Sequence, residues 1–275
     1  MIRNKLFLTL IILIASSSVL YALFIANTYG SLDFQYSPSK FFKDKINPYE
    51  QYLFGDQSKF IGAQYPLYSH ATYVFFSFFS LLEWEISRLV WSIINILLAI
   101  IGLLIISKKA KLDNYEIVFI GCIFLMSTPF RNCIGNGQIS FLVLISYCSI
   151  FLNNKFNRNF LLGLSYMKYS FMPVLAFFVF LKEGLSGLFI SGLFCLIGWL
   201  IFSLYLDQSL FHTIFQPIMV AFKGFDNGLA RGDLFTILNK NTYYLLNIKP
   251  VYLSIFLTLV ITFFLAKQVS TKQDP

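Results

Sequence analysis

Long uninterrupted runs of apolar residues, separated by short polar segments, dominate the hydrophobic pattern of the chain. Because these runs are apolar on every side, they predict helices that lie in lipid or in the core of a large protein. Several runs approach the roughly 20 residues that a helix needs to cross a hydrocarbon layer of about 30 Å. The runs expected to form crossing or partly crossing helices are 6–26, 86–107, 117–129, 139–152, 160–181, 185–206 and 251–266. The pattern predicts an all-α fold, a polytopic transmembrane helical bundle that forms one integral membrane domain over residues 1–275.

Lys and Arg at the ends of the apolar runs indicate which ends face the cytoplasm. Arg3 and Lys5 place the start of the first run there, and the KKAK segment at 108–111 does the same for the end of the run 86–107. This orientation makes residues 27–85 the first outer loop and residues 207–249 a second outer segment.

The first outer loop mixes lysines with Phe and Tyr, a composition that suits short helices lying on the membrane surface. Within it, residues 65–82 are too short for a full crossing and are expected to stay at the outer face. The run 160–181 is either one crossing or two half-helices that meet outside near Lys168. Two half-helices place both the LKEG turn at 181–184 and the basic C-terminal tail in the cytoplasm, and this arrangement is preferred.

Composition supports a membrane protein and argues against two other classes. Of the residues, 57% are hydrophobic and 12% are charged, whereas about 25% are charged in soluble domains. The net charge of +8 comes mostly from basic residues at the ends of apolar runs, so nucleic acid is not an expected partner. No CxxC spacing occurs among the four cysteines and the two histidines lie far apart, so neither a metal, a cofactor nor a disulfide is indicated.

Asp33 stands in the segment YGSLDFQYS, a few residues beyond the first apolar run and between Leu32 and Phe34. Acidic residues at a membrane boundary are often only solvated end markers. A carboxylate among apolar neighbours is partly desolvated, which makes it a better proton acceptor. The residues alone leave both roles open.

Lys168 lies near the middle of an apolar run, where a charge costs at least about 2.5–3.5 kcal/mol on insertion scales. A lysine so placed usually faces a cavity, a partner or an anionic ligand. The alternative is a solvated lysine at the tip of a hairpin. The neighbouring Tyr166, Tyr169 and Ser170 favour a functional role.

The segment FRNCIGNGQIS, residues 130–140, and the segment QYPLY, residues 64–68, carry weaker signals. Arg131 can pair with a phosphate through two hydrogen bonds, and Gln138 offers both a donor and an acceptor. Taken alone, the first segment is an ordinary turn between helices. The second is, in isolation, an aromatic anchor at the membrane interface.

In their order and spacing these elements resemble glycosyltransferase family 87, the polyprenyl-phosphate-mannose-dependent mannosyltransferases and their relatives. The first outer loop of that family carries a DF-x-x-Y element followed by NPY, and a tyrosine-proline element precedes the next apolar helix. The matching residues here are Asp33-Phe34, Tyr36 (one residue early), Asn47-Pro48-Tyr49 and Tyr65-Pro66.

Three further elements match later in the chain. Trp91 and Asn95 resemble those of the family's second crossing. Residues 137–140 match its GQ-x-N element with serine in place of asparagine, and Lys168 with Pro173 is a looser match to a Lys-x-x-Pro-like element. The elements together span residues 29–181.

The resemblance implies the C-type glycosyltransferase architecture, in which membrane helices open an outward-facing cavity and the first outer loop holds an essential aspartate. Asp33 matches that position. It is expected to accept the proton of an acceptor hydroxyl that attacks the anomeric carbon of a polyprenyl-phosphate-linked hexose, of the mannose type, with inversion. Lys168 and Arg131 are expected to stabilise the phosphate leaving group.

The remaining expected substrate contacts are Gln138, Tyr36, Tyr49 and Tyr65. The implied partners are the lipid-linked sugar donor, a lipid or glycan acceptor and membrane lipids. The implied location is the bacterial plasma membrane, with the active site facing outside.

Apart from a structural or scaffold protein, against which the lysine within an apolar run and the early acidic loop argue, two other functions remain open from the residues. A lipid-linked-sugar flippase or small-solute transporter is one, although transporters often show two corresponding halves and none is visible here. A polymerase or ligase of surface polysaccharide is the other. Such enzymes are expected to carry a late outer loop with basic residues, and the segment 207–249 has four of them: Lys223, Arg231, Lys240 and Lys249.

Overall fold

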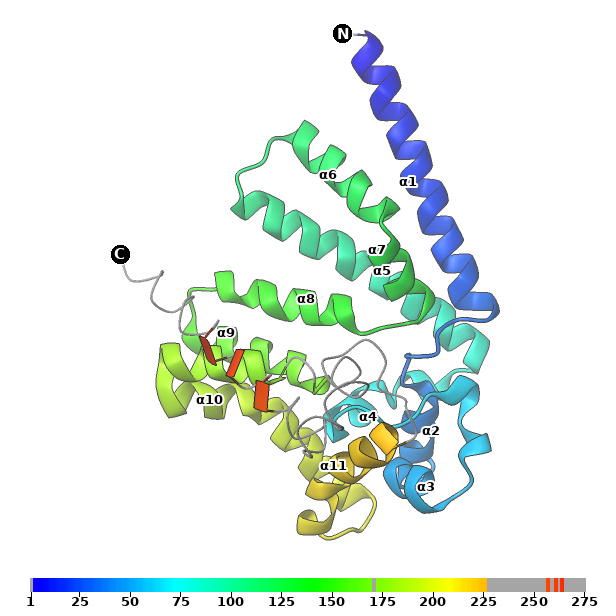
Figure 1. Cartoon of the computed structure of the whole chain (residues 1–275), viewed down its shortest axis with the longest axis vertical. Helices are drawn as coiled ribbons and strands as arrows, with labels where there is room; N and C mark the ends of the chain where they lie inside the picture. The colour runs from blue at the N-terminus through cyan, green and yellow to red at the C-terminus, as the bar shows by residue number, and fades with distance from the viewer. Residues whose placement is uncertain (1, 170–171, 227–255, 258–259, 262, 265–275) are drawn as a thin grey trace, which may run out of the picture.

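The computed structural model describes residues 2–169, 172–226, 256–257, 260–261 and 263–264, and these residues form helices and connecting loops without a strand (Figure 1). The predicted all-α fold is confirmed. The α-helices are α1 (Ile2–Thr28), α2 (Tyr36–Lys43), α3 (Pro48–Phe54), α4 (His70–Phe76), α5 (Trp84–Lys109), α6 (Asn114–Met126), α7 (Thr128–Gly135), α8 (Ser140–Cys148), α9 (Lys155–Leu162), α10 (Met172–Tyr205) and α11 (Leu210–Asp226). Residues 227–255, which include part of the expected second outer segment, lie outside the described residues, as does most of the expected last span.

By length and composition, three of the described helical segments could cross a membrane: Leu6–Thr28, Trp84–Lys109 and Leu175–Tyr205, the last of which is interrupted at Gly184. The pair α6 and α7 adds a fourth if its 60° bend lies within one span. α1 runs along one edge of the molecule, against α6 and α7, and its N-terminal end projects beyond the other helices (Figure 1). The protein is therefore a bundle of membrane helices.

The prediction of a turn over residues 130–138 is wrong for most of that range. The side chain of Ser127 accepts a hydrogen bond from the backbone N–H of Phe130, and Pro129 occupies the first helical turn. Both features begin a helix, so α7 continues to Gly135. Within residues 130–138 the chain turns only after this helix, at Gly137, where φ is +65°.

The break expected near Lys168 is present. α9 passes into a 3₁₀ turn that ends at Met167, and Lys168 has an extended backbone. α10 is interrupted again at Gly184, where φ is +66° and ψ is −160°. A Cβ atom on Gly187 would lie 3.1 Å from the Val179 side chain, although eight residues of continuous helix span about 12 Å. The LKEG segment is therefore a sharp turn, as expected.

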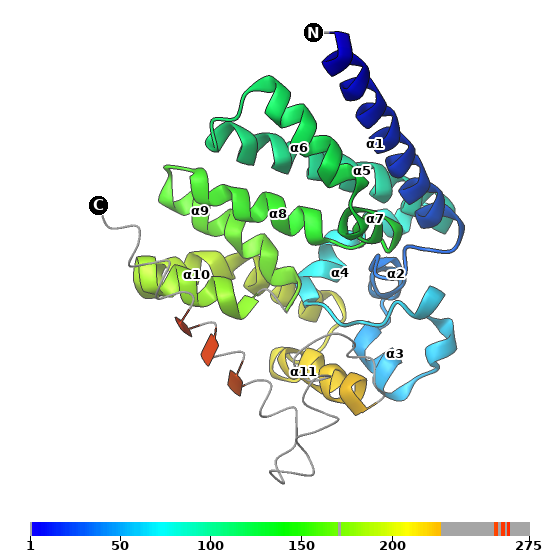
Figure 2. The ribbon, with the colours of Figure 1, turned by 45° about the horizontal axis from the view of Figure 1, so that its top comes forward.

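The segment 65–82 forms no crossing helix, as expected. It contains the seven-residue α4 and a short 3₁₀ turn, Phe79–Leu81. α4 lies in the middle of the molecule, between α10 and α2 (Figure 2). The segment 27–85 thus folds into the bundle.

An aromatic core centred on Phe34 connects the segment 27–85 to the helices. The Phe34 ring stacks on Trp91 of α5, with centroids 5.7 Å apart and planes 8° apart, and meets Phe76 and Phe79 edge to face. All four rings are buried. Such contacts add about 0.5–1.5 kcal/mol per pair beyond their buried area. This core fixes the position of the residue before Phe34.

Candidate active site

Asp33 is held by backbone contacts between the end of α1 and the end of α7. The N–H of Ser31 donates to the carbonyl of Gly135 at 2.7 Å, and the N–H of Asp33 donates to the carbonyl of Asn136 at 2.8 Å. This approach requires glycine at position 30, because a Cβ there would lie 2.1 Å from the Gly135 oxygen. Two segments about 100 residues apart in sequence therefore build one loop.

The turn after α7 is fixed from α5. The indole N–H of Trp91 donates to the carbonyl of Gly137 at 2.8 Å, and the Asn95 amide donates to the carbonyl of Gln138 at 2.7 Å. A Cβ on Gly137 would lie 2.8 Å from the Cβ of Phe34. The Trp, Asn and GQ elements singled out in the sequence thus form one support for the segment that carries Asp33.

The position of Lys168 is fixed through the residue before it, Met167. The carbonyl of Met167 accepts hydrogen bonds from the N–H of Ser69 at 3.0 Å and from the hydroxyl of Thr72 at 3.1 Å. The broken segment after α9 is thereby joined to the loop that precedes α4. Lys168 extends from this junction.

The structure brings Asp33 and Lys168 together. The ammonium Nζ of Lys168 lies 3.3 Å from Oδ2 of Asp33, and the two side chains are 23% and 30% exposed, respectively. The pair is therefore partly dehydrated but still open to a ligand. A carboxylate beside an ammonium offers a proton acceptor and a binding group for an anion in one place.

Tyr68 is a third member of the site, and the sequence patterns do not predict it. Its hydroxyl donates to Oδ2 of Asp33 at 2.8 Å, and the Lys168 ammonium lies 5.3 Å from the centre of its ring. Burial, and then the charge of Asp33, raise the pKa of Tyr68 well above its ordinary value. The phenol therefore remains a hydrogen-bond donor at neutral pH.

Arg131 is bonded away from the Asp33–Lys168 pair, whereas Gln138 lies near it. The guanidinium of Arg131 donates to the carbonyl of Met126, to Thr128 and to Ser18 of α1, none of which belongs to the Asp33–Lys168 pair. The Gln138 side-chain oxygen accepts hydrogen bonds from Ser140 at 3.2 Å and from Cys133 at 3.5 Å. Cys133 is within electrostatic range of both Asp33 and Lys168, so Gln138 lies near the pair.

The three predicted tyrosines lie in the aromatic packing. Tyr36 is buried and its hydroxyl donates to the carbonyl of Leu82 at 2.9 Å. Tyr49 is buried and its hydroxyl donates to the carbonyl of Tyr68 at 2.7 Å. The ring of Tyr65 packs on Tyr52, with centroids 4.9 Å apart. Of these three, only Tyr49 is connected to the pair, through the backbone of Tyr68.

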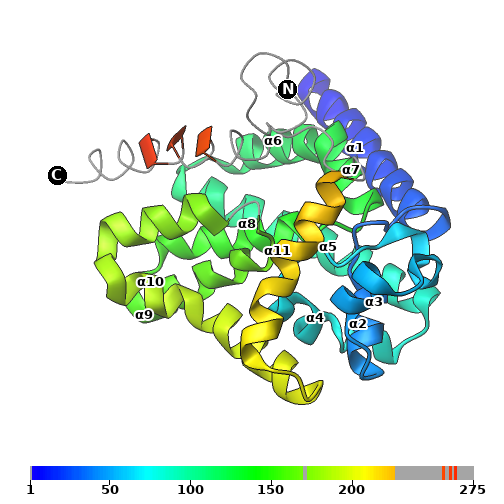
Figure 3. The same cartoon turned by 60° about the horizontal axis from the view of Figure 1, so that its bottom comes forward.

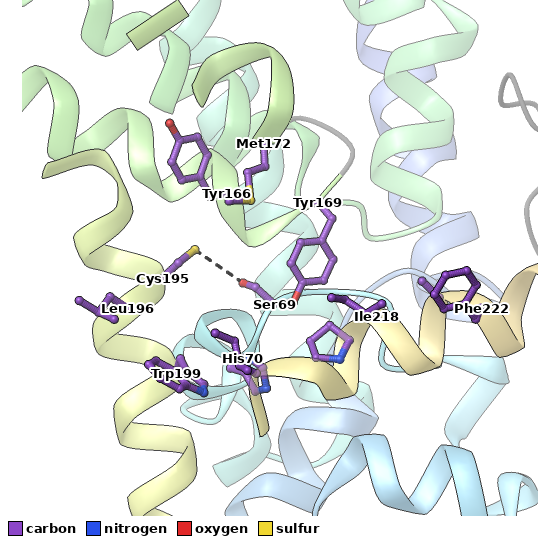
Figure 4. A pocket seen from close by; sticks show the side chains of 13 residues that line it. Ser69, His70, Tyr166, Tyr169, Met172, Cys195, Leu196, Trp199, Ile218 and Phe222 are labelled. Carbon is purple, nitrogen blue, oxygen red and sulfur yellow. Dashed lines mark hydrogen bonds between the residues drawn. The ribbon is translucent and has the colours of Figure 1, made fainter. Parts of the chain in front are cut away.

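An apolar cavity of about 600 Å³ lies between α10 and α11 (Figure 4). Its walls include Leu196 and Trp199 of α10 and Ile218 and Phe222 of α11. The cavity also reaches Ser69 and Tyr169, the residues that directly follow Tyr68 and Lys168. It therefore begins beside the candidate site and continues into an apolar space.

His70 adds no charge to this cavity. Its imidazole is buried, and burial lowers the pKa of His70 from 6.5 to about 4. The ring packs against Tyr49 and Phe202, with centroids 4.9 and 4.8 Å away. At neutral pH the histidine is therefore neutral, and the cavity suits an uncharged chain.

α11 forms one wall of the cavity and is fastened to α3 by its other side, as it crosses the molecule (Figure 3). Oε1 of Glu50 accepts hydrogen bonds from Gln208 at 3.1 Å and Gln216 at 3.3 Å, and lies 3.2 Å from Nε2 of His212. Lys223 donates to the last carbonyls of α3 at 2.8 and 3.0 Å. The residues expected to form a polar outer segment thus include an amphipathic helix.

The fold and the site define a helical membrane protein with a paired carboxylate and ammonium beside an apolar cavity. The model of glycosyltransferase family 87 matches residues 67–275. No curated protein and no solved structure matches the chain.

The chain belongs to glycosyltransferase family 87, and it is a membrane glycosyltransferase. The matched region contains Tyr68, Gln138 and Lys168 and begins after Asp33. The resemblance identified in the sequence is confirmed at the level of the family. The contact between Asp33 and Lys168 connects the segment before the matched region to the segment within it.

Proposed function

We propose that the protein transfers a hexose, of the mannose type, from a polyprenyl-phosphate donor to the hydroxyl of a lipid or glycan acceptor at the outer face of a bacterial plasma membrane. The observation that carries this proposal is the 3.3 Å contact between Asp33 and Lys168, which are 135 residues apart in sequence. A transferase that uses a lipid phosphate needs both a proton acceptor and a cation at one place.

In this mechanism the carboxylate of Asp33 accepts the proton of the acceptor hydroxyl. The freed oxygen attacks the anomeric carbon, and the bond from that carbon to the phosphate oxygen breaks with its electron pair left on the phosphate. Direct attack by the acceptor inverts the anomeric configuration. The phosphate is a good leaving group, so charge stabilisation by Lys168 matters more than a general acid.

The apolar cavity supports a lipid-linked donor. Its volume of about 600 Å³ and its lining from α10 and α11 suit several isoprene units, and it begins next to Lys168. A phosphate at the ammonium would then have its chain beside Tyr169 and Trp199. Arg131 has no part in this proposal, because its guanidinium is bonded to α1, α6 and α7.

The proposal is tested with the full-length protein in lipid nanodiscs, supplied with synthetic polyprenyl-phosphate mannose and an extract of membrane glycolipids. Mass spectrometry is expected to show one polyprenyl phosphate released for each hexose transferred to an acceptor. NMR spectroscopy of the product is expected to show the anomeric configuration opposite to that of the donor. Transfer with retained configuration, or use of a nucleotide sugar in place of the lipid donor, contradicts the proposal.

A further inference from the structure

Oδ2 of Asp33 is occupied by two donors, the Tyr68 hydroxyl at 2.8 Å and the Lys168 ammonium at 3.3 Å. Among the described residues, no side chain or backbone group donates to the other oxygen, Oδ1. The two oxygens of the carboxylate are therefore not equivalent. Oδ1 is the atom left to receive a proton.

The backbone of Tyr68 is held more tightly than an ordinary loop residue. Its N–H donates to the hydroxyl of Tyr73 at 3.0 Å, and its carbonyl accepts from the hydroxyls of Tyr49 at 2.7 Å and Tyr73 at 3.2 Å. All three tyrosines are buried. A phenol attached to a fixed backbone can hold a carboxylate in one orientation.

The same loop is joined to the segment of Lys168. The N–H of Ser69 donates to the carbonyl of Met167, so Tyr68 directly precedes one of the two joined residues and Lys168 directly follows the other. The Lys168 ammonium also lies over the Tyr68 ring at 5.3 Å. Tyr68 is therefore placed between the two groups on which the proposed function depends.

We infer that Tyr68 is a positioning residue of the transfer reaction, whose hydroxyl holds Oδ2 of Asp33 so that Oδ1 faces the acceptor hydroxyl. This inference rests on the proposed function. When a donor phosphate draws the Lys168 ammonium toward itself, the Tyr68 bond remains and keeps the carboxylate in place. Tyr68 does not touch the reacting atoms and transfers no proton.

The NPY element, Asn47-Pro48-Tyr49, has a role in this arrangement. Asn47 accepts hydrogen bonds from the N–H groups of Tyr49 and Glu50 and thereby begins α3. This start of the helix directs the Tyr49 hydroxyl to the carbonyl of Tyr68. Tyr49 thus affects Asp33 indirectly, because its hydroxyl holds the backbone of Tyr68.

The test compares Tyr68→Phe with Tyr205→Phe in nanodiscs, using synthetic polyprenyl-phosphate mannose. Tyr68→Phe keeps the ring under Lys168 and removes only the hydroxyl, whereas Tyr205→Phe removes a phenol that donates to the carbonyl of Lys43, away from the site. Because a hydrogen bond to a charged group is lost, kcat of Tyr68→Phe is expected to fall about 10- to 100-fold with KM for the donor within about twofold of wild type. The Tyr205 variant is expected to retain wild-type kcat, and the two variants are expected to unfold at similar temperatures.

A double-mutant comparison separates this inference from the proposed function. In an Asp33→Asn background, Tyr68→Phe is expected to reduce the residual rate by less than about twofold, because the two residues act through one atom. If Asp33→Asn abolishes transfer and Tyr68→Phe keeps wild-type kcat, the Tyr68 inference fails and the proposed function stands. If Asp33→Asn retains full activity, the proposed function fails.

A spectroscopic measurement tests the contact without any turnover. A fluorine label on the ring of Tyr68 is expected to change its ¹⁹F resonance when Asp33 is replaced by asparagine. The same label on Tyr205 is expected to give an unchanged resonance. If the Tyr68 resonance is the same in wild type and in Asp33→Asn, the inference is overturned even if the protein is active.

Discussion

Replacement of Asp33 with asparagine should reduce sugar transfer by a factor of about 10²–10⁴, the usual contribution of a general base. Asparagine keeps the shape of the side chain and can still accept the hydrogen bond from Tyr68. It has no charge and is a poor proton acceptor. The rate should therefore fall, while the fold and the binding of donor persist. Transfer is measured by the release of polyprenyl phosphate from polyprenyl-phosphate mannose.

Asp44→Asn is the matched control, because Asp44 is an exposed acid in the same loop. It is expected to retain the wild-type rate. Donor affinity of Asp33→Asn should equal or exceed that of wild type, because the carboxylate no longer repels the phosphate. An Asp33→Asn protein that transfers sugar at the wild-type rate removes Asp33 from the mechanism.

Replacement of Lys168 with methionine should weaken donor binding about 10- to 100-fold. One charge-assisted hydrogen bond is worth roughly 1.5–3 kcal/mol, which corresponds to this range of affinity. The loss has two sources: the phosphate loses its cation, and Asp33 keeps a negative charge that the ammonium had balanced. Binding of polyprenyl phosphate to protein in nanodiscs measures the effect.

Two variants make the Lys168 result specific. Lys59→Met removes an exposed lysine of the segment 27–85 and should leave donor affinity unchanged. Lys168→Arg keeps the charge and should recover part of the affinity, although the larger guanidinium changes the distance to Asp33. Normal donor affinity in Lys168→Met excludes the phosphate role of this lysine.

The membrane helices could be predicted from the sequence because they follow from the solvent in which the chain folds, whereas a shared site for Asp33 and Lys168 is implied by the family resemblance. Runs of about 20 apolar residues, such as 6–26 and 86–107, have few alternatives to a membrane helix. A lysine within an apolar run needs a partner, and Asp33 is its partner in the structure. The break near Lys168 is predicted from the positions of the basic residues, because two half-helices place both the LKEG turn and the basic tail in the cytoplasm.

The parts that could not be predicted depend on tertiary contacts between polar groups. The segment 64–73 contains three tyrosines, and the sequence does not distinguish Tyr68, whose hydroxyl reaches Asp33, from Tyr65, whose ring packs on Tyr52. Arg131 has the chemistry of a phosphate ligand, but it lies on α7 beside three acceptors that bind its guanidinium.

α7 and α11 were missed for different reasons. The start of α7 has a sequence signal, a serine followed closely by Pro129, which the glycines at 135 and 137 obscured. The polar composition of residues 207–249 predicts an outer segment there, although Ile214, Ile218 and Phe222 of α11 recur at helical spacing and line the cavity. In both cases a helix signal stood in a segment whose average composition indicates a loop.

The central claim is that lipid-linked donor binds with its phosphate at Lys168 and its sugar at Asp33. The most direct measurement is a cryo-EM structure of the Asp33→Asn protein in nanodiscs with polyprenyl-phosphate mannose. The account predicts a phosphate oxygen within about 3 Å of Nζ of Lys168, the lipid chain in the cavity between α10 and α11, and the anomeric carbon beside residue 33. A donor bound with its phosphate elsewhere on the bundle, and without contact to Lys168, would contradict it.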